Sequence, residues 1–219
     1  MKKYQQSKIL VFFAVLIISF LINCTDRTSV SVDEDTNTQT ASNLSALLPL
    51  KVGNEWIYNY KNNSTSLTGS LSWKIIEKRD LVNQTVYLLK QTLAVTGLNR
   101  TLIVSNKSRG IYVHGVINST GFETTFSSPR PLLKFPIEIR ASFTSWEELK
   151  FVLKADGKWV GTDAGTFKTL KYHIYKNDIE VGTWSWIKSI GPAIMITNNL
   201  NPNSIGSGGI STLSYFQIN

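Results

Sequence analysis

From about residue 49 to the end of the chain, hydrophobic and polar residues alternate with a period of two rather than 3.6. The first such segment places Val52, Trp56, Tyr58 and Tyr60 on one side and Glu55, Asn59 and Lys61 on the other. Side chains of a strand point alternately to its two faces, so this pattern is typical of strands with one buried face. No part of this region shows a helical stripe, and the sequence therefore predicts an all-β domain over residues 46–219 with Trp56 in its core.

Further short hydrophobic segments follow at the spacing expected of a sandwich or a barrel. They are 71–75, 86–89, 102–104, 111–117, 151–154, 159–160, 167–175, 183–187, 193–196 and 212–218. Asp156-Gly157 and Lys176-Asn177-Asp178 lie between such segments and predict hairpin turns. We therefore expect about ten or eleven antiparallel strands that form a meander, a sandwich or a (half-)barrel.

Two strand beginnings resemble each other within this region. Pro49-Leu50-Lys51-Val52 and Pro136-Ile137-Glu138-Ile139 each follow a pair of leucines and precede a tryptophan. A duplicated β unit, with halves near 46–135 and 136–219, is one interpretation. The alternative is that such a proline-led pattern is simply a common way to begin a strand.

The first 23 residues have the organisation of a bacterial signal peptide. A basic head, MKKYQQSK, precedes residues 9–22, where only Ser19 is polar. As a helix this stretch would span about 21 Å, whereas a bilayer core of about 30 Å needs nearly twenty residues. The pattern therefore favours a signal peptide over a stable transmembrane helix. The alternative is an uncleaved anchor that leaves Cys24 an ordinary thiol.

The hydrophobic stretch ends in Leu21-Ile22-Asn23-Cys24, which resembles the lipobox of bacterial lipoproteins. Cys24 is the only cysteine of the chain, and Asn23 stands where Ala or Gly is usual in that motif. The resemblance implies cleavage after Asn23, a diacylglyceryl thioether on Cys24 and acylation of the new amino group with a chain such as palmitate. Two or three lipid chains on one residue give durable attachment, because a single chain binds a membrane only marginally. We therefore expect a lipoprotein signal peptide over residues 1–23 and lipid attachment at Cys24.

The lipidated cysteine is followed by a polar segment. Residues 25–45 are rich in Thr, Ser, Asn and Asp and contain few hydrophobic side chains. Such a composition predicts a flexible tether over residues 24–45, with a mean reach of about 25 Å. In bacterial lipoproteins an Asp directly after the cysteine retains the protein at the inner membrane, so Thr25 implies export to the outer membrane. The expected location is the bacterial cell envelope.

Four segments of the β domain carry a second resemblance. They are residues 49–58 (PLKVGNEWIY), 164–172 (AGTFKTLKY), 186–196 (WIKSIGPAIMI) and 212–215 (TLSY). Their order and sequence resemble a group of uncharacterised bacterial secreted lipoproteins, over about 170 residues. The resemblance implies an all-β lipoprotein, and it implies no particular activity.

Residue patterns that support catalysis or metal binding are scarce. One Cys and two His exclude an internal disulfide and leave almost no basis for a Cys/His zinc site. P-loop, dinucleotide, G-x-S-x-G and H-E-x-x-H motifs are missing from the sequence. His114 and His173 lie within expected strands, without a nearby Asp or Glu at ligand spacing, and are expected to be half-exposed. The neighbours Glu147 and Glu148 would point to opposite faces of a strand. We therefore expect no catalytic residues, no metal and no cofactor, and a protein that is not an enzyme.

The net charge argues against a nucleic-acid partner. Of the formal charge of +8, Lys2, Lys3 and Lys8 of the signal peptide contribute three, which leaves +5. No run of Lys and Arg is longer than two. Nucleic-acid binding normally needs a clustered basic stripe, so the sequence predicts no such partner.

Six tryptophans stand out in a chain of 219 residues. We expect Trp73, Trp184 and Trp186 to pack in the core, and a sugar- or lipid-stacking surface is the alternative. The sequence as a whole favours a lipid-anchored, non-catalytic binding or interaction module that contacts envelope or host macromolecules. The alternatives are a carrier that holds a hydrophobic ligand such as a lipid in a β-sheet cavity, and an enzyme of unrecognised type.

Overall fold

The computed structural model describes residues 48–63, 65, 67–81, 84–107, 109–135, 138–198 and 208–219. The predicted signal peptide, Cys24 and the tether lie outside these residues. Within the part described, no helix is both long enough and apolar enough to cross a membrane.

The described part of the β domain consists of twelve strands and one short 3-10 turn. The strands are β1 (Glu55–Asn62), β2 (Thr68–Leu81), β3 (Gln84–Leu93), β4 (Leu98–Lys107), β5 (Gly110–Ile117), β6 (Glu123–Lys134), β7 (Ser142–Thr144), β8 (Lys150–Thr162), β9 (Gly165–Lys176), β10 (Ile179–Ile187), β11 (Gly191–Thr197) and β12 (Gly209–Gln217), and the turn is η1 (Ala94–Thr96). All the strands pair antiparallel in one sheet. The prediction of an all-β fold is confirmed.

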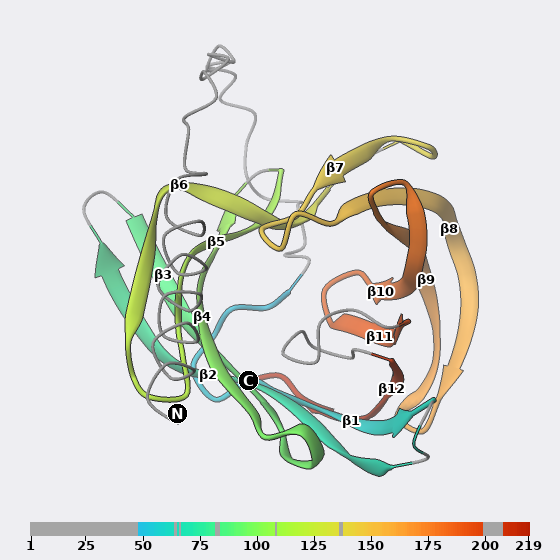
Figure 1. Ribbon diagram of the computed structural model, residues 1–219, viewed down its shortest axis with the longest axis horizontal. Helices are drawn as coiled ribbons and strands as arrows, with labels where there is room; N and C mark the ends of the chain where they lie inside the picture. The colour runs from blue at the N-terminus through green and yellow to red at the C-terminus, as the bar shows by residue number, and fades with distance from the viewer. Residues whose placement is uncertain are drawn as a thin grey trace, which may run out of the picture. The chain divides into compact units, whose positions relative to one another are not determined.

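Strand order in the sheet is β6-β5-β4-β3-β2-β1-β12-β11-β10-β9-β8-β7. The chain meanders outward from the central β1 to the edge at β6, crosses to the other edge at β7 and returns to β12, which pairs with β1. Figure 1 shows the sheet bent round into a nearly closed barrel. Beside the two edge strands, the backbone amide of Trp146 donates to the carbonyl of Pro131 at 2.8 Å. Of the expected arrangements, the meander that closes toward a barrel is the one observed.

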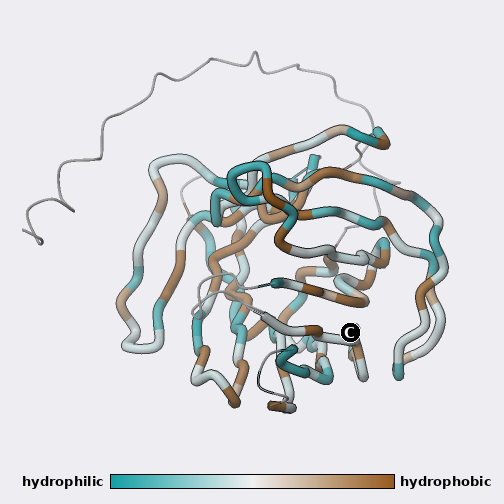
Figure 2. Tube along the Cα trace, turned by 45° about the vertical axis from the view of Figure 1, so that its right-hand side comes forward, coloured by the Kyte–Doolittle hydropathy of each residue, from teal (hydrophilic) through white to brown (hydrophobic). Residues whose placement is uncertain are grey.

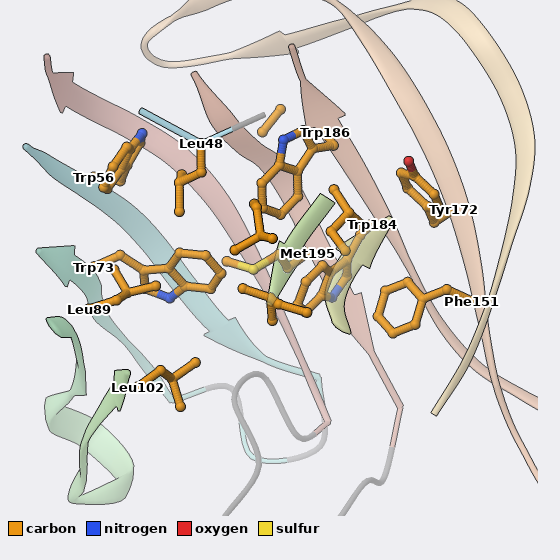
Figure 3. Close-up of a cluster of buried hydrophobic side chains, with 14 of the residues drawn as sticks. Leu48, Trp56, Trp73, Leu89, Leu102, Phe151, Tyr172, Trp184, Trp186 and Met195 are labelled. Atoms are coloured by element: carbon orange, nitrogen blue, oxygen red, sulfur yellow. The ribbon is translucent and has the colours of Figure 1, made fainter. Parts of the chain in front are cut away.

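The inside of this barrel is filled by aliphatic and aromatic side chains (Figure 3). Trp73 meets Trp184 edge-on with ring centres 6.4 Å apart, and Trp184 meets Phe151 at 5.2 Å. Trp56 and Trp186 are fully buried in the same cluster. Figure 2 shows hydrophobic and hydrophilic residues side by side along the strands, and in β1 buried and more exposed residues alternate strictly, as expected of a strand with one face on the core. Core packing of Trp56, Trp73, Trp184 and Trp186 is therefore confirmed.

Some predicted local features are wrong. Asp156-Gly157 is no hairpin turn: it lies inside β8, where Gly157 (φ +77°) accompanies a register shift between Asp156 and Lys158. Val52 is 47% exposed because it belongs to the turn before β1. By contrast, Asn177 and Asp178 form the predicted turn between β9 and β10 with φ values of 50° and 59°.

Strand β6 was not expected, because its sequence ETTFSSPRPLLK is mostly polar and contains two prolines. A proline removes a backbone donor and is tolerated at a sheet edge, which is where β6 lies. Strand β7 has only three residues, too few for a periodic signal. The two halves considered for a duplication contain β1–β6 and β7–β12. The duplication itself stays a prediction.

The long β8–β9 hairpin lies on the right-hand side of the barrel in Figure 1, and its turn reaches the central strands β12 and β1. At its turn, the backbone amide of Ala164 donates to Leu213 O of β12 at 3.4 Å. Phe167 of β9 packs edge-on against Phe216 of β12, with ring centres 6.1 Å apart. The turn of this hairpin is thereby held beside β12 and β1.

Candidate functional site

The described part begins with a segment that is bound firmly to the barrel. Leu48 is fully buried, and its carbonyl accepts a hydrogen bond from Asn106 Nδ2 at 2.9 Å. Asn54 Nδ2 donates to the carbonyl of Pro49 at 2.7 Å, and Asn54 Oδ1 accepts from the backbone amide of Asn219 at 2.9 Å. Residues 48–54 are therefore held against the barrel by burial and by side-chain hydrogen bonds.

Trp56 connects this segment to the turn before β11. Its Nε1 donates to the carbonyl of Ile190 at 2.6 Å. Gly191 has φ +135°, and a Cβ there would lie 3.0 Å from Leu48 Cδ1 and 3.2 Å from Trp56 Nε1. Only glycine fits such a backbone next to such close neighbours. Residues 49–58 and 186–196, which carry the resemblance to secreted lipoproteins, therefore meet as a structural cluster rather than as a ligand site.

His114 is buried, contrary to the expectation of a half-exposed histidine. Its Nε2 lies 2.8 Å from Ser105 Oγ, and its Nδ1 lies 3.1 Å from the side-chain amide of Gln84. Burial lowers the pKa of His114 below its ordinary value of 6.5, and the charge of Lys107 lowers it further. The alternation of polar and apolar residues did not predict this burial. A small second hydrophobic cluster of Val86, Leu88 and Ile103 is buried on the outer face of the neighbouring strands β3 and β4.

The contact between Ser105 and His114 has the geometry of a nucleophile and its base. However, only 4% of Ser105 and 5% of His114 is exposed, so an acyl substrate cannot reach the hydroxyl. Gln84 in the third position is neutral and cannot stabilise an imidazolium as a carboxylate does. The arrangement satisfies the buried side chains of Ser105 and His114, which would otherwise cost free energy, and the partly buried Gln84 completes it. Sequence spacing did not indicate it, since Gln84 lies 30 residues before His114.

The other titratable residues that the sequence singled out are dispersed. The β9–β10 hairpin brings Glu180 Oε2 to 3.0 Å from His173 Nδ1, and this histidine is partly exposed. Glu147 accepts a hydrogen bond from Arg100 Nη1 at 2.9 Å, while Glu148 occupies a turn with φ +61°. Among the described residues, no group of three His, Cys, Asp or Glu could hold a metal ion.

Arg100 takes part in a stack beside the barrel edges. Its guanidinium carbon lies 4.9 Å from the centre of the Trp146 ring, and Trp146 lies 6.4 Å from Phe126. The guanidinium carbon of Arg130 lies 4.8 Å from the centre of the Phe126 ring. Because Trp146 follows β7 whereas Arg100, Phe126 and Arg130 lie on β4 and β6, this stack links the two edges of the sheet.

A groove lies where the β8–β9 turn meets the central strands, and we refer to it as the hairpin groove. Its volume is about 580 Å³. It is lined by Asn59, Tyr60 and Lys61 of β1, Thr68 and Gly69 of β2, Ile210 and Thr212 of β12, and Asp163 of the β8–β9 turn. The wall is held by a hydrogen bond of 2.7 Å from Asn59 Nδ2 to Asp163 Oδ2.

The chemical groups of the hairpin groove are mixed. Lys61 supplies a cationic donor, Asp163 an anionic acceptor, and Thr68 and Thr212 supply hydroxyl groups. Ile210 and Gly69 add apolar surface. The period-two pattern predicted Asn59 and Lys61 on the solvent face, and both are exposed. It could not show that Asp163, 104 residues after Asn59, lies beside them.

Comparison with known proteins adds little to this description. No family model and no curated protein matches the chain. Among solved structures, a Bacteroides fragilis protein inferred to be exported, with a YmcC-like fold, shares 10% identity at a TM-score of 0.46. A Parabacteroides distasonis protein inferred to be a lipoprotein shares 12% identity at a TM-score of 0.45. Each similarity covers 80% of this chain and 100% of the other. At these TM-scores neither carries an argument about this protein.

Proposed function

We propose that the protein is a lipid-anchored lipoprotein of the bacterial envelope that acts as a non-catalytic binding or interaction module. In this proposal lipid on Cys24 attaches it to the membrane, and the tether of residues 24–45 presents the β domain to envelope or host macromolecules. The observation that carries the binding function is the hairpin groove, a preformed surface site with donors, acceptors and apolar area. Thr25 after the cysteine favours the outer membrane as the location.

The non-catalytic part of the proposal is supported by the surroundings of the histidines. The Ser105–His114 contact is enclosed, and the partner of Nδ1 is a neutral amide. A hydrolase with this pair would need a path for substrate to Ser105 Oγ. The pair therefore serves packing in this proposal.

The carrier alternative finds little support in the packing of the barrel. A lipid carrier needs an apolar cavity. Here Trp73, Trp184 and Met195 extend into the interior and are buried together with Leu89 and Leu102 (Figure 3). We therefore place the binding function on the surface of the domain.

Fractionation of cells that express the full chain or its Cys24→Ala variant tests the proposed attachment. We expect the wild-type chain to take up radioactive palmitate and to enter the detergent phase on Triton X-114 partition. The Cys24→Ala variant should take up no label, while its β domain still folds. Ser19→Ala, which changes only the signal peptide, is a control and should be labelled normally. Label on the Cys24→Ala variant would refute lipid attachment.

A further inference from the structure

We propose that the hairpin groove binds a neutral glycan, an inference that rests on the proposed function and specifies its ligand class. The groove combines polar groups of both kinds with apolar surface, within about 580 Å³. Sites for small molecules typically measure about 300–1,000 Å³. The groove is therefore large enough for a segment of an oligosaccharide.

The donors and acceptors of the groove match hydroxyl groups. Every sugar hydroxyl can donate one hydrogen bond and accept others, so it fits a site with both kinds of partner. Asp163 can only accept, Lys61 can only donate, and Thr68 and Thr212 can do either. Charge-assisted hydrogen bonds from Lys61 and to Asp163 would be the strongest contacts of such a ligand.

The charge balance of the groove selects a neutral ligand. Lys61 and Asp163 carry opposite charges, and the other lining side chains are uncharged. An anionic polymer would gain from Lys61 and lose against Asp163, and a cationic polymer would have the reverse balance. A neutral glycan is the class for which neither charge is unfavourable.

The apolar surface of the groove fits the rings of a glycan rather than a lipid chain. Ile210 and the backbone of Gly69 offer a small area against which the C–H face of a pyranose ring can pack. A lipid chain would desolvate the charged groups of Lys61 and Asp163 without offering either a polar partner, which is costly.

The wall of the groove is in place before a ligand arrives. The hydrogen bond from Asn59 to Asp163 and the contact from Ala164 N to Leu213 O hold the β8–β9 turn against the central strands. Binding then requires little ordering of the chain, which lowers its entropic cost.

Saturation-transfer NMR on the full lipidated chain tests this inference. The protein is kept in lauryldimethylamine oxide micelles, because sugar-based detergents would compete for the groove. Maltotetraose, cellotetraose and chitotetraose are the neutral probes, and tetragalacturonate is the anionic comparison. We expect saturation transfer to at least one neutral probe and a weaker signal from tetragalacturonate.

Matched variants locate the site. Thr68→Trp fills the groove from an exposed position, and Lys61→Met removes its cationic donor. Thr124→Trp and Lys90→Met make the same changes at exposed positions on β6 and β3 outside the groove. Thr68→Trp should raise the Kd of the neutral probe at least about tenfold and Lys61→Met about threefold or more, while both controls stay within about twofold.

The outcomes separate this inference from the proposed function. The inference is wrong if no neutral probe binds, if tetragalacturonate binds more tightly, or if Thr68→Trp leaves the Kd unchanged. In each of these cases the palmitate labelling of the wild-type chain and of Cys24→Ala still tests lipid attachment independently. If a probe is hydrolysed during the measurement and Thr68→Trp abolishes binding, the groove inference stands and the non-catalytic proposal fails.

Discussion

Truncation of Trp56 to alanine should destabilise the β domain severely. Trp56 is fully buried against Leu48 and Gly191, and its Nε1 donates to Ile190 O at 2.6 Å. Removal of a buried Trp side chain costs about 3–5 kcal/mol, and the carbonyl left without a donor adds about 1 kcal/mol. Domains of this kind have a total stability of about 5–15 kcal/mol. Trp56→Ala therefore removes a large part of the free energy of unfolding.

Thermal unfolding of residues 46–219, followed by circular dichroism, measures this loss. For a domain of this size each kcal/mol corresponds to about 2–4 °C, so a loss of about 4–6 kcal/mol should lower the midpoint by about 8–24 °C. Trp159→Ala is the matched control, because Trp159 is 65% exposed. Its effect should stay within about 0.5 kcal/mol. Equal midpoints for the two variants would refute the reasoning, and loss of ligand binding without loss of stability would make Trp56 a recognition residue.

Three further expectations follow from the same structure. Residues 46–219 alone should be soluble and give a far-UV spectrum of β structure, and a spectrum dominated by helix would contradict the fold. Tyr58→Phe should leave the thermal midpoint unchanged or stabilise the domain by about 1 kcal/mol, because the buried hydroxyl has no hydrogen-bond partner among the described residues. A loss of stability of more than about 1 kcal/mol would show that the hydroxyl has a partner. His114 has a pKa below 6.5 in the folded state, so its contribution to stability is full above pH 6.5 and is lost as the pH falls from there through the folded-state pKa. The pH dependence of chemical denaturation should flatten below pH 6.5 in His114→Gln, and an unchanged slope would show that another group titrates.

Local sequence was sufficient to predict which side chains are buried wherever one face of a strand is buried and the other is solvated. Along β1, Trp56, Tyr58 and Tyr60 are buried and Asn59 and Lys61 are exposed, as the alternation predicts. The reason is geometric, since successive side chains of a strand point to opposite faces.

The same rule failed where the sheet buries both of its faces. His114 and Ser105 belong to the outer face of β4 and β5, yet Ile103 and Val86 on that face are buried too. A pattern of polar and apolar residues cannot show that a second cluster covers the outer face. Likewise Asp156-Gly157 has the composition of a hairpin turn, but the chain continues through it as a bulge because β9 pairs with both sides of it.

The sequence by itself determined the class of fold, the core position of Trp56, Trp73, Trp184 and Trp186, and the expectation of a lipid anchor at Cys24. These properties depend on residues close together in the chain: alternation along a strand, and a hydrophobic run followed by the only cysteine. Only the tertiary structure decided the closure of the barrel and the composition of the hairpin groove. Asn59 and Asp163 meet because β1 pairs with β12 and the turn of the β8–β9 hairpin lies beside that pair, so their distance depends on the register of the whole sheet rather than on any local pattern.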